Sequence, residues 1–273
     1  MPHFTVRPVD GAAWITGASS GIGRAVALLL AAKGFTVHAT ARSADDLDAL
    51  ASEASGLSGR IVATPGDVTD PEAMTAIVER IIADTGPLAL AIFNAGVFLP
   101  VSGEALQASR FKKTFDVNLM GVVNGLVPAV GVMKPAGRGQ IAIVSSVAGY
   151  SGLPSSAAYG ASKAGLTNMA ESLKFDFDKL GIRIQVIHPG FVETPATEKN
   201  PFEMPALMKV DDAAGRIVEG LASSSFEITF PRRFTYVLKF LRMLPYPLYF
   251  TLMNKATGWE DRPLETAMRE DKA

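Results

Sequence analysis

The chain has 273 residues, of which 48% are hydrophobic and 19% are charged, and its formal net charge is −1. This composition is typical of a globular domain and excludes a disordered chain, and the small net charge does not indicate nucleic-acid binding. The absence of cysteine excludes disulfides, thiolate nucleophiles and cysteine metal sites. The three histidines are scattered without paired spacing, so no metal site is predicted.

The hydropathy pattern predicts a cytoplasmic protein. The first ten residues contain no apolar run typical of a secretory signal. No stretch of about 20 residues is apolar without a charge or a proline, so a membrane-spanning helix is not expected. A chain without cysteine also fits a reducing compartment.

Short apolar runs alternate with helical patterns along most of the chain. Strands are expected at 12–16, 35–40, 61–63, 89–93, 141–144, 182–187 and about 228–230. Helices are expected at 22–32, 47–54, from 70–72 onward, 111–130 and 157–180. This alternation predicts a parallel sheet covered on both faces, in one doubly wound Rossmann-type α/β domain over residues 1–273 with a mainly parallel seven-stranded sheet.

A glycine-rich loop joins the first expected strand to the first expected helix. It reads Thr16-Gly-Ala-Ser-Ser-Gly-Ile-Gly23. Glycines let a backbone approach a pyrophosphate closely, and a helix N-terminus favours anions. The loop therefore indicates a dinucleotide site, and the alternative is a glycine-rich turn without a ligand.

Tyr159 and Lys163 are four residues apart on the last long helix, so they share one face. A nearby ammonium favours the phenolate, so we expect Lys163 to lower the pKa of Tyr159 and make it useful as an acid or base. Such a pair also occurs by chance on many helices, so further motifs are needed to support a catalytic role.

Further motifs follow in order, and with them the chain resembles the short-chain dehydrogenase/reductase family from about residue 12 to 195. The glycine loop matches the Thr-Gly-x-x-x-Gly-x-Gly motif of that family, and Asn94-Ala95-Gly96 resembles its Asn-Ala-Gly motif. Ser146 lies 13 residues before Tyr159, which is the usual spacing of the family's catalytic serine, and is preferred over Ser145. Asn118, Pro189-Gly190 and Thr194 match the remaining motifs.

The resemblance implies an NAD(P)-dependent oxidoreductase of alcohols and carbonyls, usually a homodimer or homotetramer. It implies that Tyr159 exchanges a proton with the substrate oxygen and that Ser146 holds that oxygen. Lys163 would bond the cofactor ribose, and Asn118 would hold a water that links Lys163 to solvent. The implied cofactor site comprises Gly17, Ser19, Ser20, Gly21, Ile22, Gly23, Arg42, Asp67, Val68, Asn94, Ala95, Gly96, Tyr159, Lys163, Pro189, Gly190, Val192 and Thr194.

Several of these residues have structural alternatives. Ser146 can simply end a strand, Asn118 can satisfy the backbone, and Lys163 can be a solvated surface charge. Asp67 can be a turn or cap residue instead of an adenine contact.

The end of the second strand favours NADP(H) over NAD(H). Ala41 stands where the NAD enzymes of the family carry an aspartate, and Arg42 and Ser43 follow with groups that suit a 2′-phosphate. Against this, Ser19 and Ser20 occupy the family's second basic site, and Asp45 and Asp46 lie close by. We interpret the two aspartates as the first residues of the next helix.

Residues 196–273 should contain a substrate loop, the last strand and a C-terminal extension. The loop is expected to be a mobile apolar lid, with a disordered surface loop as the alternative. Phe98 to Pro100 are expected at the mouth of the site, and ordinary packing is the alternative for them. The lid residues are Pro195, Pro201, Met204, Pro205, Leu207 and Met208.

The extension is rich in aromatic and basic residues, and Pro245 and Pro247 are expected to break its helix. Three interpretations remain open for residues 231–273. They cover the substrate pocket or a neighbouring subunit, they lie on an anionic membrane through about 232–255, or they form a loose tail.

The sequence thus predicts an NADP(H)-dependent carbonyl reductase or alcohol dehydrogenase. The alternatives are a family member that catalyses epimerisation or dehydration, and a nicotinamide-binding sensor or scaffold without turnover.

Overall fold

The computed structural model describes residues 4–198 and 204–262, so Pro201 and the residues after 262 lie outside the described part. The strands are β1 (Ala12–Thr16), β2 (Thr36–Thr40), β3 (Arg60–Ala63), β4 (Leu88–Phe93), β5 (Gly139–Val144), β6 (Ile182–Pro189) and β7 (Glu227–Phe230). The α-helices are α1 (Gly21–Ala32), α2 (Ala44–Glu53), α3 (Pro71–Thr85), α4 (Ala108–Phe115), α5 (Gly121–Ala136), α6 (Ala157–Lys179), α7 (Val210–Ala222), α8 (Arg232–Arg242) and α9 (Tyr246–Thr257).

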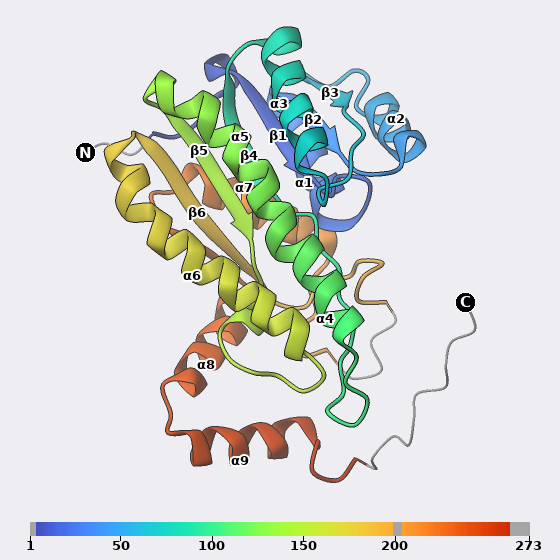
Figure 1. The fold of residues 1–273 in the computed structure, drawn as a ribbon, viewed down its shortest axis with the longest axis vertical. Coiled ribbons are helices and arrows are strands. Elements are labelled where there is room, and N and C mark those ends of the chain that lie inside the picture. The colour runs from blue at the N-terminus through green and yellow to red at the C-terminus, as the bar shows by residue number, and fades with distance from the viewer. Residues whose placement is uncertain (1–3, 199–203, 263–273) are drawn as a thin grey trace.

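The strands form one parallel sheet in the order β3-β2-β1-β4-β5-β6-β7 (Figure 1). The direction of strand order reverses between β1 and β4. In such sheets a crevice opens outside the carboxyl ends of the strands at that point. The predicted doubly wound α/β fold with seven strands is confirmed.

Two apolar layers cover the two faces of the sheet. Alternate residues of a strand point to opposite faces, so Ala13 and Ile15 pack with α1, α2 and α7, whereas Ala12 and Trp14 pack with α3, α5 and α6. Figure 1 shows α5 and α6 in front of the sheet and α7 behind it. The mainly apolar character of the strands is explained by this burial on both sides.

The long helical stretch expected at 111–130 is longer and is interrupted. It consists of α4, a π-helical turn at Asp116–Met120, and α5. Residues Ala108–Ala136 are the one candidate membrane span among the described residues, by length and apolar character alone. In the structure α5 packs on β4, β5 and α3, so this stretch is a helix of the α/β fold.

Two helices were not predicted. Helix α7 buries Ala213, Ala214, Ile217, Val218 and Leu221. Their spacing of three or four residues is typical of an amphipathic helix, so the sequence contained the information to predict it. Helix α9 begins after Pro245 and carries Pro247 in its first turn, where a missing N–H costs nothing. The two prolines therefore separate two helices, with the second starting directly after the break.

Helices α8 and α9 lie beyond the carboxyl ends of the strands, at the lower end of the view in Figure 1. The inner face of α8 packs Leu238, with Phe234 and Leu241, against Val147 and Tyr150. The extension is thus attached to the segment that follows β5.

Trp14 connects three strands within the core. Its side chain is fully buried, its Nε1 donates to Thr40 Oγ1 at 2.9 Å, and its ring meets Phe93 edge-on at 5.6 Å. Trp14→Ala is expected to lower the free energy of unfolding by about 3–5 kcal/mol, because it leaves a cavity and removes the hydrogen bond to Thr40. Urea denaturation measures this effect. The exposed Phe175→Ala is the control and should stay within about 0.5 kcal/mol of the parent protein; an equal loss in both variants would contradict the role of Trp14.

Candidate active site

The glycine loop is held to the end of β4 by Asn94. Its Nδ2 donates to the carbonyl oxygens of Thr16 (3.1 Å) and Gly17 (3.0 Å), and its backbone N–H donates to Thr16 Oγ1 at 3.1 Å. A Cβ added at Gly23 would lie 2.3 Å from the Gly17 oxygen and 2.5 Å from Asn94 Nδ2. Gly23 is therefore required by the close packing of the loop itself.

The N-terminus of α1 offers donors to an anion. Ser20 precedes the helix, and its side chain makes no capping hydrogen bond within the described residues. Gly21 has a φ of +54°, which turns the loop into the helix, and a Cβ there would meet Thr194 Cγ2 at 3.1 Å. The backbone N–H groups of a first helical turn bind phosphate oxygens well. This loop therefore fits the pyrophosphate of a dinucleotide.

The carboxyl end of β2 opens into a cavity of about 480 Å³ lined by Ser19, Arg42, Ser43 and Asp46. The Arg42 side chain is exposed and has no ion pair within the described residues. Ser43 accepts a hydrogen bond from the Asp46 backbone N–H at 3.2 Å and so caps α2. Asp46 thus belongs to the first turn of α2, and Arg42 is the cation of this cavity.

Asp67 and Val68 both make structural contacts after β3. Asp67 Oδ1 accepts hydrogen bonds from the backbone N–H of Thr69 (2.9 Å) and from its hydroxyl (2.8 Å), and these bonds lower the pKa of Asp67. The Val68 carbonyl accepts from Asn124 Nδ2 at 2.9 Å. The turn role that we considered for Asp67 is present in the structure.

Tyr159 and Lys163 lie one turn apart on α6, beside the end of β5. Lys163 is buried, and its Nζ donates to the Val144 carbonyl at 2.8 Å and lies 5.6 Å from the centroid of the Tyr159 ring. Ser146 is the second residue after β5 and hydrogen-bonds Tyr159. Phe98, expected at the mouth of the site, meets the Tyr159 ring edge-on at 5.2 Å.

Burial dominates the electrostatics of this pair. It raises the pKa of Tyr159, and the hydrogen bond with Ser146 only partly opposes that effect. Burial also lowers the pKa of Lys163 to about 8. The pKa of Tyr159 in the protein alone is therefore shifted in the direction opposite to the one expected from Lys163, because burial is the largest cause.

The two serines at the end of β5 have different surroundings. Ser145 is buried; its Oγ donates to the Lys163 carbonyl at 2.8 Å and lies 3.1 Å from Thr167 Oγ1. Ser146 Oγ accepts from the Ala148 backbone N–H at 3.2 Å and also hydrogen-bonds the Tyr159 side chain, so its hydroxyl lies beside the phenolic oxygen.

Asn118 lies in the π-helical turn with its side chain fully engaged. Its Oδ1 accepts from the Val97 N–H at 2.7 Å, and its Nδ2 donates to the Val97 carbonyl (2.9 Å) and to Ser162 Oγ (3.2 Å). A Cβ added at Gly96 would lie 3.4 Å from Asn118 Oδ1 and 3.5 Å from Lys163 Nζ. Asn118 and Lys163 therefore flank Gly96, and any water held by Asn118 must use its main chain.

The segment after β6 closes the other side of the crevice. The Gly190 N–H donates to the Phe230 carbonyl at 2.8 Å, and the buried Val192 forms a β-bridge with Met208. Pro189 ends β6. Together with the Thr194 contact at Gly21, these bonds bring the expected Pro189–Thr194 residues to the glycine loop.

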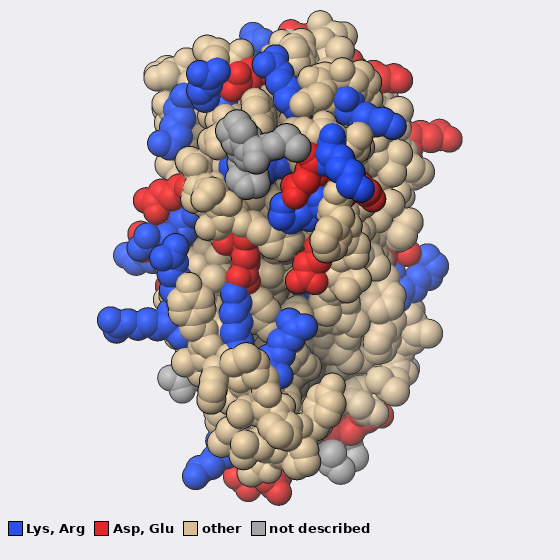
Figure 2. All heavy atoms as spheres, turned by 90° about the vertical axis from the view of Figure 1, so that its left-hand side faces the viewer, with Lys and Arg blue, Asp and Glu red and all other residues tan. Residues whose placement is uncertain are grey.

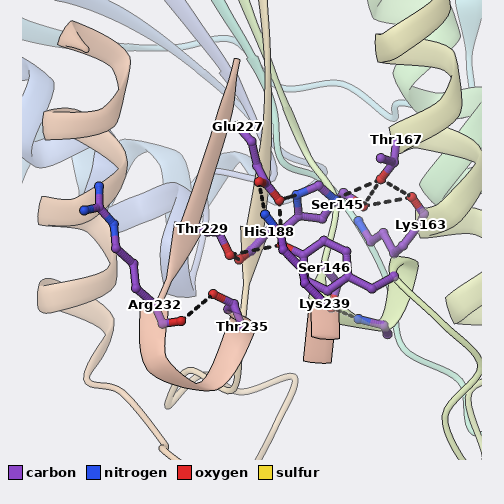
Figure 3. Close-up of polar contacts among 12 residues, drawn as sticks. Ser145, Ser146, Lys163, Thr167, His188, Glu227, Thr229, Arg232, Thr235 and Lys239 are labelled. Atoms are coloured by element: carbon purple, nitrogen blue, oxygen red, sulfur yellow. Dashed lines mark hydrogen bonds and ion pairs between the residues drawn. The ribbon is translucent and has the colours of Figure 1, made fainter. Parts of the chain in front are cut away.

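A buried polar network next to these residues was not predicted. His188 Nδ1 on β6 lies 2.9 Å from Glu227 Oε1 on β7, and its Nε2 lies 2.9 Å from Thr167 Oγ1 on α6 (Figure 3). Tyr150 donates to Glu227 Oε1 at 2.6 Å, and Lys239 from α8 pairs with Glu227 Oε2. Thr167 and Ser145 both donate to the Lys163 carbonyl, so the network joins α8 to the catalytic helix.

The network determines the ionisation of Glu227. Burial alone would raise the pKa of Glu227, but hydrogen bonds from His188, Lys239 and Tyr150 lower it to about 2. Burial raises the pKa of Tyr150, and its hydrogen bond to Glu227 raises it further, so this phenol stays protonated. Glu227 is therefore the negative centre of the network.

Glu227→Gln is expected to destabilise the protein at neutral pH, because the variant loses the carboxylate that Lys239 faces. A depressed carboxyl pKa gives stability that is present above the ordinary value of 4.5 and is lost as the pH falls toward about 2. The difference in unfolding free energy between parent and variant should shrink over this interval, as measured by urea unfolding. Asp178→Asn, in an exposed pair with Lys174, is the control and should show almost no difference. A constant difference for Glu227→Gln across the interval would contradict the assignment.

Comparisons with known proteins agree with this geometry. A family model described as short chain dehydrogenase matches residues 11–204. An uncharacterized oxidoreductase of Myxococcus xanthus is 36% identical over 237 residues, covering 87% of this chain and 94% of the relative. The 3-oxoacyl-[acyl-carrier-protein] reductase FabG of Thermotoga maritima is 37% identical over 187 residues, covering 68% of this chain and 76% of the relative.

Further relatives support the same family. Cyclohexanol dehydrogenase of Acinetobacter sp. (strain SE19) is 35% identical over 184 residues, covering 67% of this chain and 73% of the relative. A crystal structure of a 3-ketoacyl-ACP reductase from Sinorhizobium meliloti 1021 superposes with a TM-score of 0.71 at 30% identity, covering 80% of this chain and 96% of that one. The chain therefore belongs to the short-chain dehydrogenase family and is an NAD(P)-dependent oxidoreductase acting on CH–OH groups.

Proposed function

We propose that the protein is an NADP(H)-dependent carbonyl reductase or alcohol dehydrogenase whose general acid is Tyr159. The observation that carries this proposal is the convergence of Tyr159, Ser146 and Lys163 at the carboxyl end of β5. A phenol and a hydroxyl at one point can both donate to a single substrate oxygen.

In the reductive direction, Tyr159 gives its phenolic proton to the carbonyl oxygen while Ser146 donates a hydrogen bond to the same oxygen. NADPH, when bound, would supply the hydride that the carbonyl carbon receives. Burial raises the pKa of Tyr159, so the phenol is protonated at neutral pH and can serve as the proton donor in reduction. Oxidation requires the phenolate and is expected to need higher pH.

The remaining cofactor residues are assigned by their places around the crevice. The loop from Gly17 to Gly23 receives the pyrophosphate, Asp67 and Val68 lie toward the adenine, and Asn94 to Gly96 form the floor. Residues Pro189 to Thr194 hold the nicotinamide end. Lys163 bonds the ribose, and Asn118 supports a water path to Lys163 through its main chain.

Arg42 is the residue that would select NADP(H). It lines the cavity at the end of β2, and a guanidinium there can pair with a 2′-phosphate while Ser43 and Ser19 contribute polar contacts. Ala41 offers no carboxylate to bind a free 2′-hydroxyl or to repel the phosphate.

The substrate class that we propose is a ketone or secondary alcohol with an apolar body. The relatives named as a 3-oxoacyl carrier-protein reductase and a cyclohexanol dehydrogenase support this class. Phe98 beside Tyr159 would give the mouth of the site an apolar wall. Epimerisation, dehydration and ligand sensing without turnover are the alternatives.

We also propose a single domain over residues 1–273, in which about 1–195 form the cofactor-binding and catalytic core and about 196–273 provide the substrate loop, the last strand and the extension. The packing of α8 on the segment after Ser146 supports one unit. A cytoplasmic homodimer or homotetramer is the expected assembly.

Tyr159→Phe tests the mechanism. The substitution removes only the phenolic oxygen, so kcat for NADPH-dependent reduction of a ketone panel that includes cyclohexanone should fall by about 10²–10⁴-fold. NADPH binding, measured by fluorescence titration, should be retained. Turnover that survives would refute the assignment, and a parent protein that binds NADPH but turns over no ketone or alcohol would favour the sensor.

Ser146→Ala and Ser145→Ala form a matched pair in the same assay. Ser146→Ala should lower kcat by about 10²-fold or more, because a donor to the developing oxyanion is lost. Ser145→Ala should retain most of kcat, since this hydroxyl bonds the Lys163 carbonyl and does not face the ligand. A larger loss at Ser145 would reverse the assignment of the two serines.

Arg42→Ala tests the cofactor preference. The loss of a charge-assisted bond should raise the Kd of NADPH about tenfold or more and leave that of NADH nearly unchanged. Isothermal titration with both cofactors provides the measurement, and NADH is the internal control. Tighter binding of NADH than of NADPH by the parent protein would contradict the role of Arg42.

A further inference from the structure

The C-terminal helices carry most of the exposed apolar surface. Among the described residues, sixteen large apolar side chains are exposed, and nine of them fall within residues 236–259. A cluster of this kind on a folded domain indicates an interaction surface. The nine are Tyr236, Val237, Phe240, Met243, Tyr246, Leu248, Phe250, Leu252 and Trp259.

Helix α8 separates an anchored face from an exposed face. Thr235 and Leu238 are buried against the body of the protein, whereas Tyr236, Phe240 and Met243 recur at helical spacing on the opposite side. Met243 is 75% exposed. The outer face of α8 therefore has no packing partner in the described residues.

Helix α9 packs against the rest of the protein through one narrow face. Tyr249 and Met253 are its buried residues, and the Tyr249 hydroxyl donates to the Gly152 carbonyl at 2.6 Å. Tyr246, which is 77% exposed, stacks on the exposed Phe250 with ring centroids 6.0 Å apart. The apolar surface thus continues from α8 onto α9.

The charges on this surface are mainly basic, and two exposed acidic residues, Glu260 and Asp261, follow directly after Trp259. Between Ile228 and Trp259 the chain has five basic residues and no acidic residue. Lys239 pairs with Glu227, which leaves Arg232, Arg233, Arg242 and Lys255, all exposed and without an ion pair in the described residues. Figure 2 shows the lower part of the molecule, where α8 and α9 lie, as mainly uncharged, with basic side chains above it and acidic side chains at its lower edge.

The charges on this surface favour one of two possible binding partners, which are a second copy of the chain and an anionic membrane. A two-fold contact with a second copy would bring two mainly basic surfaces together, which is unfavourable in a desolvated interface. An anionic lipid surface instead offers phosphates to the arginines and an acyl boundary to the apolar side chains. Tyrosine and tryptophan also suit this boundary, because their rings are apolar and their polar atoms stay hydrated.

We propose that α8 and α9 dock on an anionic phospholipid membrane, with the outer face of α8 and the exposed side chains of α9 inserted at the headgroup boundary. The inner face of α8 stays packed on Val147 and Tyr150. Docking therefore brings the segment that follows Ser146 close to the bilayer.

Vesicle flotation of the full chain tests the proposal. The parent protein should float with vesicles of phosphatidylcholine and phosphatidylserine and much less with phosphatidylcholine alone. Phe240→Ser with Met243→Ser should reduce binding to anionic vesicles more than tenfold, and Phe175→Ser, an exposed aromatic on α6, is the matched control and should bind like the parent. Arg233→Gln with Arg242→Gln should reduce binding by more than about tenfold and weaken its salt dependence.

Turnover of a soluble ketone should be unchanged in these variants, so the outcome does not depend on the proposed reaction. No flotation of the parent with anionic vesicles would overturn the proposal, as would equal flotation of the Phe240 and Phe175 variants. Light scattering gives a further check: a parent oligomer that dissociates on Phe240→Ser with Met243→Ser would show that a second copy covers this surface and would also overturn it.

Discussion

The attachment of Lys163 to the end of β5 is the interaction on which the candidate site depends. Its Nζ donates to the Val144 carbonyl, and its own carbonyl accepts from Ser145 and Thr167. A Cβ at Gly149 would lie 2.9 Å from the Lys163 carbonyl carbon, so only a glycine lets the turn after Ser146 approach α6 this closely. Lys163 is thus fixed by hydrogen bonds of both its side-chain ammonium and its backbone carbonyl. This places Tyr159, one turn earlier on α6, beside Ser146.

The same burial determines the chemistry. Burial away from water raises the pKa of a phenol and lowers the pKa of an ammonium. Both effects are present here, at Tyr159 and Lys163. The free protein therefore holds a protonated Tyr159, as its proposed role of proton donor requires. A negatively charged group near Lys163 would restabilise its charge, so cofactor binding is expected to change the ionisation of the pair.

Much of the core could be predicted from sequence because each signal was local: alternating strands and helices, the glycine loop, and the spacing of Ser146 to Tyr159. The network around Glu227 could not be, since His188 and Glu227 meet only through the pairing of β6 with β7. The sequence did not predict helix α9, because Pro245 and Pro247 indicate where a helix ends and do not show that a second helix begins between them. The pKa of Tyr159 was assigned the wrong direction because a spacing shows the neighbouring charge and does not show the desolvation.

The most direct test of this account is an NMR titration of tyrosine ¹³Cζ in the free protein, with the Tyr159 signal assigned by its loss in Tyr159→Phe. Burial predicts that Tyr159 stays protonated through neutral pH and ionises above the ordinary tyrosine value of 10.0. Ionisation of Tyr159 below pH 8 in the free protein would contradict the account, because Lys163 would then control the phenol without the cofactor.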